Sequence, residues 1–548
     1  MVELSWDHEA DIVVVGSGAA AHSAAITARS KGADVIMVEK AASHGGTTMR
    51  SGGGFWIPNN RFQRERGIVD SKDDATRYMA RYSYPQLFDP DDPHLGLPDH
   101  EYELIESYYD HACEMVEFMD RVGAVKPIQE INWTGQPQID YQEGIPENKC
   151  IRGRVLYSQD PEGKMSYGDE LVRQMHSWAT EHEIPLFLGH RVSRIVRSAT
   201  GEVLGVEAST ADGGTVSFRA RRAVVFGSGG FTHDPDLMLR LQRGPHFGGC
   251  AAPANTGDFF YLGTEIGAMP ANTAGAWRAE IVLEQALSDP NGSHNVFYVV
   301  GDSMLEVNKR GVRIMDEKRN YTDRSMVHFV WDPNRAEWTN MLVFYIYDER
   351  TATLWQGFPP LPPQGAVAPY VISADTLDGL AEAIGGRLKI LAPHTGEFSL
   401  DPSFAVNLRH TVERYNAFAT AGLDEDFQRG EFAYDREWTT FPPVAPGAEW
   451  PPTGSKNITM YPLSPKGPYH AIILGAGTLD TNGGPMINGK AQVLDTHGKP
   501  IPGLYGAGNC IASPTANAYW GAGSTIGPAL TFGHVAGLNA VDEPVRAG

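Results

Sequence analysis

The stretch Asp11-Ile-Val-Val-Val-Gly16-Ser-Gly18-Ala-Ala-Ala21 decides the fold of the amino-terminal part of the chain. Its first five residues predict a buried β-strand, because Asp11 is followed by four apolar residues, and the two glycines allow a tight turn into a helix from Ala19 to about Gly32. The positive end of such a helix, beside backbone that no side chain covers, binds a pyrophosphate. The stretch therefore predicts a dinucleotide-binding unit.

An acidic residue follows the second apolar run of this unit. The run at 35–38 predicts the next strand, and Glu39 comes directly after it. An acid about 20 residues beyond the glycines hydrogen-bonds a ribose diol and repels a 2′-phosphate, so it favours FAD or NAD over NADP. A glycine pair alone also ends ordinary strands, but here the strand, the helix and the acid come in the expected order.

The composition is that of a globular protein with more than one domain. The chain has 548 residues, 42% hydrophobic and 20% charged, and this length predicts two or three domains. The net charge of −22 argues against a nucleic-acid partner or an anionic membrane surface. The acidic start offers no signal peptide and no apolar run is long enough for a membrane span, so we expect a cytoplasmic protein.

Cysteine and histidine spacing predicts no metal site. The four cysteines lie far apart without a Cys-x-x-Cys pair, which also argues against a disulfide framework. We expect reduced thiols.

Three glycine-rich segments lie far apart in the chain. The opening motif continues into 44–54, a second segment covers 223–231, and a third covers 503–509 and 521–528. A single nucleotide site on one unit would need only the first of them. We therefore expect the chain to leave the cofactor domain and return to it, which is how a long cofactor is held at both ends.

The segments between these motifs differ in texture. Residues 276–445 contain paired aromatic residues, proline-rich turns and a helical pattern near 403–421, which indicate an inserted domain. Residues 185–225 carry the turn sequences of β-hairpins. Residues 125–165 are polar and rich in turns, and we expect a lid or a surface excursion there.

Longer motifs make the chain similar to a known group of enzymes. They lie at 45–48 with 51–60, at 311–321, and at 502–509 with 519–529. On these motifs the chain resembles, almost end to end, the flavoproteins that include fumarate reductase flavoprotein subunits and 3-ketosteroid dehydrogenases. It looks most like the ketosteroid dehydrogenases.

The resemblance implies a fold and a cofactor. The fold class is α/β, with a discontinuous Rossmann-like FAD-binding domain in residues 1–275 and 446–548 around an inserted α+β catalytic domain in residues 276–445. The cofactor is non-covalently bound FAD. The reaction removes two hydrogens from adjacent carbons beside the ketone of a 3-ketosteroid or a related cyclic ketone, and the electron acceptor that reoxidises the enzyme is of unknown identity.

Such a reaction needs donors for the ketone oxygen, a base for the α-proton and a flavin N5 that receives hydride. By similarity, the Tyr519 hydroxyl and the Gly523 N–H bind the ketone oxygen. Tyr321 is the base, and because a tyrosine with a pKa near 10 is a poor base at neutral pH, it needs help. The helper remains open among three residues, Tyr141, Tyr157 and Arg324.

The resemblance also assigns residues to the cofactor. The pyrophosphate contacts are Gly16, Gly18, Ala20 and Ala21, and the adenosine ribose contact is Glu39. The contacts to the ribityl chain and ring are Thr47, Thr48, Ser51, Gly52 and Gly53. The contacts to the isoalloxazine are Gly508, Asn509, Ser524, Thr525 and Ile526. We expect Gly227 and Gly229 to support packing instead.

Three alternatives stay open. Trp520 stands where ketosteroid enzymes usually carry proline, so a smaller ketone such as an oxocyclohexanecarboxylate would also suit the donor turn. Reduction of an unsaturated acid, as in fumarate reductase, needs arginine clamps, and the candidates are Arg278 and Arg324. The third alternative is a non-catalytic flavin scaffold.

Overall fold

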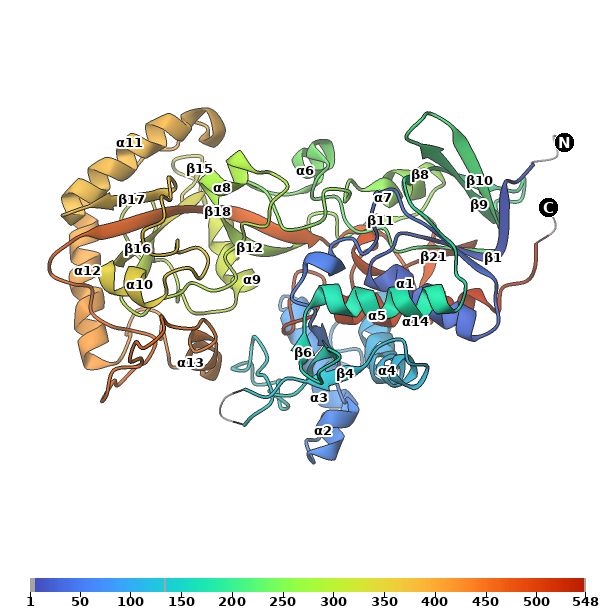
Figure 1. The fold of residues 1–548 in the computed structure, drawn as a ribbon, viewed down its shortest axis with the longest axis horizontal. Helices are drawn as coiled ribbons and strands as arrows, with labels where there is room; N and C mark the ends of the chain where they lie inside the picture. The colour runs from blue at the N-terminus through green and yellow to red at the C-terminus, as the bar shows by residue number, and fades with distance from the viewer. Residues whose placement is uncertain (1–4, 133–134, 547–548) are drawn as a thin grey trace. The chain divides into compact units, whose positions relative to one another are not determined.

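The structure is a computed structural model that describes residues 5–132 and 135–546 (Figure 1). It is a mixed α/β protein whose chain forms two compact units. Unit 1 comprises residues 1–242, 251–277 and 480–548, and unit 2 comprises residues 243–250 and 278–479.

Unit 1 contains an eight-stranded sheet with a parallel centre. The parallel strands, in spatial order, are β7 (Leu186–Phe187), β2 (Val35–Val38), β1 (His8–Val15), β10 (Thr215–Phe226) and β21 (Pro500–Gly506). The antiparallel strands are β20 (Gln492–Leu494) beside β21, β9 (Val203–Thr210) beside β10, and β8 (His190–Arg197) beside β9. The predicted strands at 11–15 and 35–38 and the predicted hairpins are confirmed.

The register of the parallel strands aligns their carboxyl ends. Val15 pairs with both Val38 and Phe226, and Phe226 pairs with Gly506. The glycine turns that follow β1, β10 and β21 therefore leave the sheet at the same edge. Segments from both ends of the sequence meet there.

Two helices from opposite ends of the chain pack closely in unit 1. They are α1 (Ala19–Ser30) and α14 (Ile526–Ala540). A Cβ on Gly533 of α14 would lie 2.4 Å from the Ala20 carbonyl oxygen of α1, so only glycine allows this approach. The predicted first helix is confirmed.

A smaller sheet of unit 1 consists of β3 (Phe55–Trp56), β5 (Val155–Gln159), β4 (Pro127–Gln129) and β6 (Met165–Ser166). The segment 125–165, where we expected a lid or a surface excursion, supplies three of these strands and buries Asp140 and Arg154 completely, while its residues 133 and 134 lie outside the described part of the chain. The other elements of unit 1 are α2 (Arg61–Glu65), α3 (Lys72–Ser83), α4 (Asp99–Arg121), α5 (Gly168–Glu181), α6 (Pro235–Leu241), α7 (Asp258–Glu265), β11 (Pro270–Ala271) and β19 (Gly484–Pro485).

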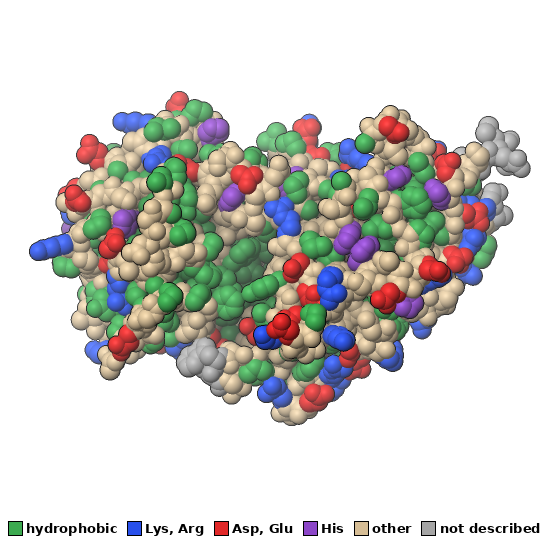
Figure 2. Space-filling view, viewed as in Figure 1, with side chains coloured by type: hydrophobic (Ala, Val, Ile, Leu, Met, Phe, Trp, Pro, Cys, Tyr) green, Lys and Arg blue, Asp and Glu red, His purple; other side chains and the backbone are tan. Residues whose placement is uncertain are grey.

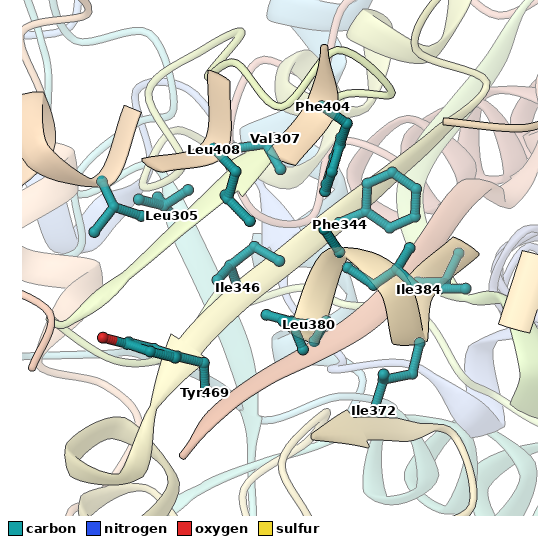
Figure 3. Close-up of a cluster of buried hydrophobic side chains, with 14 of the residues drawn as sticks. Leu305, Val307, Phe344, Ile346, Ile372, Leu380, Ile384, Phe404, Leu408 and Tyr469 are labelled. Atoms are coloured by element: carbon teal, nitrogen blue, oxygen red, sulfur yellow. The ribbon is translucent and has the colours of Figure 1, made fainter. Parts of the chain in front are cut away.

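Unit 2 is organised by a five-stranded sheet of β12 (Ala276–Val282), β18 (Tyr469–Thr481), β16 (Leu342–Asp348), β13 (Met304–Val307) and β17 (Val371–Ala374). Two helices, α11 (Leu377–Thr395) and α12 (Phe404–Ala421), contribute apolar side chains to its core (Figure 3). Phe344 of β16 meets Phe404 of α12 edge to face, with ring centroids 5.6 Å apart. The predicted helix near 403–421 is confirmed. The remaining elements are α8 (Leu283–Ser288), α9 (Tyr321–Arg324), β14 (Trp331–Asp332), β15 (Glu337–Trp338), α10 (Glu349–Leu354) and α13 (Ala433–Thr439).

The surface carries both signs of charge. Acidic and basic side chains are intermingled on the face drawn in Figure 2. None of the helices within 5–132 and 135–546 combines the length and the hydrophobicity that a membrane crossing requires. All four cysteines are free thiols, two of them buried.

Candidate active site

A cavity of about 450 Å³ opens in unit 1 at the edge where the glycine turns meet. Its wall comes from the turn after β1, from residues 38–51, from the turns after β10 and β21, and from the start of α14. Eleven of the predicted cofactor residues line it: Gly16, Gly18, Ala20, Glu39, Thr47, Thr48, Ser51, Gly508, Asn509, Thr525 and Ile526. The parallel register explains why residues so distant in sequence share one cavity.

The amino end of α1 faces this cavity as an anion site. Gly18 precedes the helix without a side-chain cap, and the Ala19 N–H donates to Thr48 Oγ1 at 3.0 Å. The Ala20 N–H lies in the same first turn and has no intrahelical partner. Together with the positive end of the helix, it suits a pyrophosphate.

Gly16 makes the turn possible in two ways. Its φ of +108° is a conformation that side chains disfavour, and a Cβ would lie 2.4 Å from the Gly227 carbonyl oxygen.

We expect Gly16→Ala to displace the turn and to weaken FAD binding by on the order of tenfold or more. The retained visible flavin absorbance of the folded variant measures this effect. Gly386→Ala, in open space within α11, is the matched control and should keep full occupancy.

Glu39 is held at the cavity wall by two hydrogen bonds. Its Oε2 accepts from Ser17 Oγ at 2.7 Å, and its Oε1 accepts from the Ala41 N–H at 2.8 Å. Ser17 Oγ in turn accepts from the Gly45 N–H at 3.0 Å, which ties the first turn to the second glycine segment. Sequence reasoning missed Ser17, although its place between two glycines of the motif was a usable signal.

Asp480 links three turns around the cavity. This carboxylate is 1% exposed and accepts hydrogen bonds from the Gly230 N–H at 3.0 Å, from Asn255 Nδ2 at 2.6 Å and from Asn509 Nδ2 at 3.0 Å. Burial holds the pKa of Asp480 above its usual value, although these donors offset part of the increase. The Asn509 side chain therefore braces the wall. No sequence signal marked Asp480, because its partners come from distant segments.

Four predicted cofactor residues are not among the lining residues: Ala21, Gly52, Gly53 and Ser524. Ala21 lies under Gly227, where a Cβ would come 2.7 Å from the Ala21 nitrogen. Ser524 Oγ hydrogen-bonds to the backbone of Gly521 at 2.9 Å. In contrast, Gly227 and Gly229, which we expected only to support packing, are part of the wall.

Tyr519 lies in an aromatic group of unit 1. The side chain is 3% exposed, and its ring stacks on Tyr141 with centroids 5.5 Å apart and an interplanar angle of 18°. Trp277 meets the same ring edge-on at 6.3 Å. The ring orientation of Tyr519 is thus set from two sides.

Gly523 follows in a turn that requires glycine. Its φ is +88°, and a Cβ would lie 2.4 Å from backbone atoms of Gly54. The Gly523 carbonyl accepts from the Trp56 N–H at 3.2 Å. Within the described residues, no acceptor takes the Gly523 N–H. Thr525, two residues further on, lines the cavity.

Trp520 points into the interior. It is fully buried, its Nε1 donates to Ser83 Oγ at 3.0 Å, and its ring packs on Trp56 and Tyr108 with centroids 5.4 Å from each. It does not line the 450 Å³ cavity. The large side chain of Trp520, at a position where ketosteroid enzymes usually carry proline, is therefore buried in the protein interior.

Tyr321 belongs to unit 2 and begins α9. It is 7% exposed and meets Phe297 edge to face with centroids 5.1 Å apart. The segment before it is held by a buried ion pair, since Arg313 contacts Glu317 at 2.7 Å and Asp424 at 2.9 Å. Although burial raises the pKa of Glu317, the neighbouring arginines outweigh it and bring that pKa to about 2. The ion pairs of Arg313 with Glu317 and Asp424 thus stabilise the motif at 311–321.

The two arginines considered as carboxylate clamps differ. Arg324 is 3% exposed and is engaged by Glu280 at 2.5 Å and by the Val296 carbonyl at 2.8 Å. Arg278 is 5% exposed and lies over the Phe329 ring at 4.2 Å. Burial lowers the pKa of Arg278 to about 10, so it keeps its positive charge at neutral pH.

Three histidines cluster beside the cavity. His44 stacks on His176 with centroids 3.8 Å apart, and His22 meets His176 edge-on at 5.7 Å. Burial, and next the neighbouring His176, lower the pKa of His22 to about 4. Among the described residues, no group of three or more histidine, cysteine or acidic side chains is arranged to hold a metal ion.

The low pKa of His22 predicts a stability loss in acid. The folded state favours neutral His22, so its stability contribution is present above pH 6.5 and is lost as the pH falls from 6.5 toward 4. We expect His22→Gln to flatten the dependence of the unfolding free energy on pH by up to about 1.4 kcal/mol per pH unit in this window. Denaturant titrations at several pH values measure it, and exposed His497→Gln is the control. Identical slopes for both variants would contradict this assignment.

Comparisons with known proteins show the family of the chain. The chain matches the family described as FAD binding domain over residues 11–526. A 4-oxocyclohexanecarboxylate 2-dehydrogenase of Sinomonas cyclohexanicum is 30% identical, with 96% of this chain and 92% of that protein covered. A 3-oxosteroid 1-dehydrogenase of Mycolicibacterium smegmatis is 28% identical, with 97% of each chain covered.

A solved structure has the same fold. The 3-ketosteroid delta1-dehydrogenase of Sterolibacterium denitrificans, in complex with 1,4-androstadiene-3,17-dione, superposes with a TM-score of 0.80. It is 24% identical in sequence, and the match covers 98% of this chain and all of that one.

Proposed function

The chain belongs to the FAD binding domain family and is an FAD-dependent oxidoreductase that acts on CH–CH groups, and from this premise we propose that it desaturates a ring ketone. The reaction removes a proton from the carbon next to the ketone and a hydride from the carbon beyond it, which leaves a C=C bond. The observation that carries the proposal is the turn in which the buried Tyr519 and the unengaged N–H of Gly523 lie four residues apart.

FAD fits the cavity of unit 1. The first turn of α1 suits its pyrophosphate, Glu39 suits its adenosine ribose, and the start of α14 suits the negatively charged side of its reduced ring. Bound FAD supplies the hydride acceptor. We propose that the FAD is bound without a covalent link and that the predicted cofactor residues in the cavity wall contact it.

The residues of the chain handle the ketone oxygen and the proton. In our proposal the Tyr519 hydroxyl and the Gly523 N–H donate to the ketone oxygen and stabilise the enolate that forms when the α-proton leaves. Tyr321 takes that proton. We further propose that unit 1 is the cofactor domain, discontinuous and Rossmann-like, and that unit 2 is the catalytic domain; unit 2 extends to residue 479, beyond the boundary at 445 that we expected from the sequence.

Two substrate classes follow from the relatives. The matches to 3-oxosteroid 1-dehydrogenases support a 3-ketosteroid, and the 30% identical relative supports a keto acid of the oxocyclohexanecarboxylate type. For the keto acid we propose that Arg278 binds the carboxylate, because it is buried and cationic. The engagement of Arg324 by Glu280 argues against a pair of clamps, and so against fumarate-like reduction.

Anaerobic mixing with single substrates tests this function. We expect 4-androstene-3,17-dione or 4-oxocyclohexanecarboxylate to bleach the flavin absorbance and to yield a product with one additional C=C bond next to the ring ketone. If neither ketone bleaches the flavin, the desaturase proposal fails and a flavin scaffold becomes the better account. An artificial electron acceptor then gives the turnover rate.

Arg278→Gln separates the two substrate classes. If the keto acid is the substrate, this change should raise its KM by about tenfold or more, because a charge-assisted contact is lost. The KM of neutral 4-methylcyclohexanone should stay within about twofold. Equal changes in both KM values would remove Arg278 from carboxylate recognition.

A further inference from the structure

A buried ion cluster lies in unit 1 behind the Tyr519–Gly523 turn. Arg154 contacts Asp70 through two hydrogen bonds of 2.8 and 2.7 Å, and Asp140 through one of 2.7 Å. The side chains of all three residues are fully buried. Burying three charges is costly, and an apolar cluster of the same volume is often as stable, so stability alone does not explain the arrangement.

The cluster holds Trp56 by its indole ring. Asp140 Oδ1 accepts from Trp56 Nε1 at 2.9 Å, and the Arg154 guanidinium lies 5.0 Å from the centroid of the indole. The Trp56 carbonyl also accepts from the Tyr108 hydroxyl. Trp56 is thus fixed at both its ring and its backbone, with no exposed surface.

The donor turn is wrapped closely around Trp56. The Trp56 N–H donates to the Gly523 carbonyl at 3.2 Å, which fixes the peptide bond that follows Gly523 and so limits the rotation of the one before it, which carries the Gly523 N–H. At Gly521, a Cβ would lie 2.5 Å from Trp56 Cδ1 and 3.0 Å from Asp140 Oδ1. At Gly527, it would lie 2.5 Å from the Trp56 carbonyl oxygen. A shift of the indole would therefore have to move the turn.

Asp140 also reaches the second donor through its neighbour in the chain. Tyr141 follows it directly and stacks on the Tyr519 ring at 5.5 Å. The backbone at Asp140 is anchored, because its N–H donates to the Ile151 carbonyl at 2.9 Å. The Asp140 carboxylate thus holds the support of one proposed ketone donor, and its anchored backbone leads directly to the support of the other.

We propose that Asp140 is a positioning residue, which orients the Gly523 N–H through Trp56 and the Tyr519 ring through Tyr141. The proposal rests on the proposed ketone desaturation. In this proposal, the carboxylate oxygen of Asp140 is needed because it accepts from the indole N–H of Trp56. The negative charge of Asp140 takes no part in proton transfer. Small displacements of a donor change turnover much more than they change substrate binding.

Three variants separate these contributions. Asp140→Asn keeps an oxygen acceptor for Trp56 but loses the bond from Arg154 Nη1, which still donates to Asn148 Oδ1 and belongs to a guanidinium that stays paired with Asp70. Asp140→Ala and Trp56→Phe both remove the indole hydrogen bond. Trp178→Phe is the matched control, since its indole N–H donates to the Val122 carbonyl at 3.0 Å elsewhere in unit 1. Each variant is measured in the full-length, FAD-loaded protein, with far-UV circular dichroism as the check on folding.

The first readout needs no substrate. Hydrogen–deuterium exchange of the amides in residues 519–527 should be about tenfold faster in Asp140→Ala and Trp56→Phe, and unchanged in Asp140→Asn and Trp178→Phe. Exchange in the central strands β1 and β10 should be the same in all variants. Unchanged exchange of 519–527 in both Asp140→Ala and Trp56→Phe would overturn the proposal, whatever the enzyme does with ketones.

The second readout uses turnover of the ketone that the wild-type enzyme oxidises. We expect kcat to fall about tenfold in Asp140→Ala and Trp56→Phe, with KM within about threefold, and to recover to within about threefold of wild type in Asp140→Asn. An equal loss in Asp140→Asn or in Trp178→Phe would contradict positioning through the indole. If wild type oxidises no ketone while the exchange result holds, the desaturase proposal fails and the hold of Asp140 on the turn stands.

Discussion

Tyr519→Phe should lower kcat by on the order of 10² to 10³, because it removes one of two donors that stabilise the developing enolate. The aromatic ring stays, so its stacking on Tyr141 and its edge contact with Trp277 should persist. FAD occupancy should remain at the wild-type level, since Tyr519 does not line the cofactor cavity. Steady-state kinetics with a saturating ketone, together with the flavin absorbance of the purified protein, measure both quantities.

Tyr505→Phe is the matched control for this prediction. Tyr505 lies on β21 and is buried in unit 1, and its hydroxyl donates to Glu543 at 2.9 Å. Its kcat should stay within about twofold of wild type. A Tyr519→Phe enzyme with full turnover would remove that hydroxyl from the mechanism, and an equal loss in both variants would point to a general effect on folding.

Tyr321→Phe should abolish proton removal from the substrate. We expect kcat to fall by on the order of 10² or more, because the phenyl ring has no group that can accept the α-proton. The sharper measurement is exchange of the substrate α-hydrogen with D₂O under anaerobic conditions, followed by NMR. This exchange reports enolate formation without the hydride step, and it should slow by the same factor as turnover.

Tyr345→Phe is the control within unit 2. Its hydroxyl is buried and donates to the Val300 carbonyl at 2.7 Å. The expected result is wild-type α-hydrogen exchange. If Tyr321→Phe lost turnover but exchanged the α-hydrogen at the wild-type rate, another group would be the base, and Tyr321 would act at a different step.

The parts of the fold that sequence could predict are those that local pattern determines. The run at 12–15 is continuously apolar because this part of β1 is covered on both faces, and Gly16 follows because only glycine accepts the turn geometry there. The acid at Glu39 could be placed because its spacing depends on one strand and one helix. Such features involve neighbours within about 30 residues, so a single sequence contains them.

Contacts between distant segments were not predictable in the same way. Charged residues among turn-forming residues are typical of a surface segment. The side chains of Asp70, Asp140 and Arg154 are nevertheless completely buried. Asp480 is similar, since its partners Asn255 and Asn509 lie far from it in the chain. A charged side chain can be buried only when groups of opposite charge or hydrogen-bonding groups surround it. Because these partners come from distant segments, the residue pattern of one segment does not reveal them.

Trp520 illustrates a third reason. The sequence placed it in the donor turn, where a large side chain would narrow a substrate pocket. In the structure its backbone belongs to that turn while its side chain points to Ser83 and Trp56. Side-chain direction in an irregular turn depends on the tertiary contacts around it, whereas in strands and helices it follows the period of the element.

The close packing of α1 against α14 bears on how the protein is made. The wall of the cofactor cavity needs β1 and α1 and also β21 and the start of α14, which are translated much later than the first two. A nascent chain that ends before residue 500 therefore offers FAD an incomplete site. We expect flavin loading to follow the translation of α14, and the part of β10 that pairs with β21 stays unpaired until then.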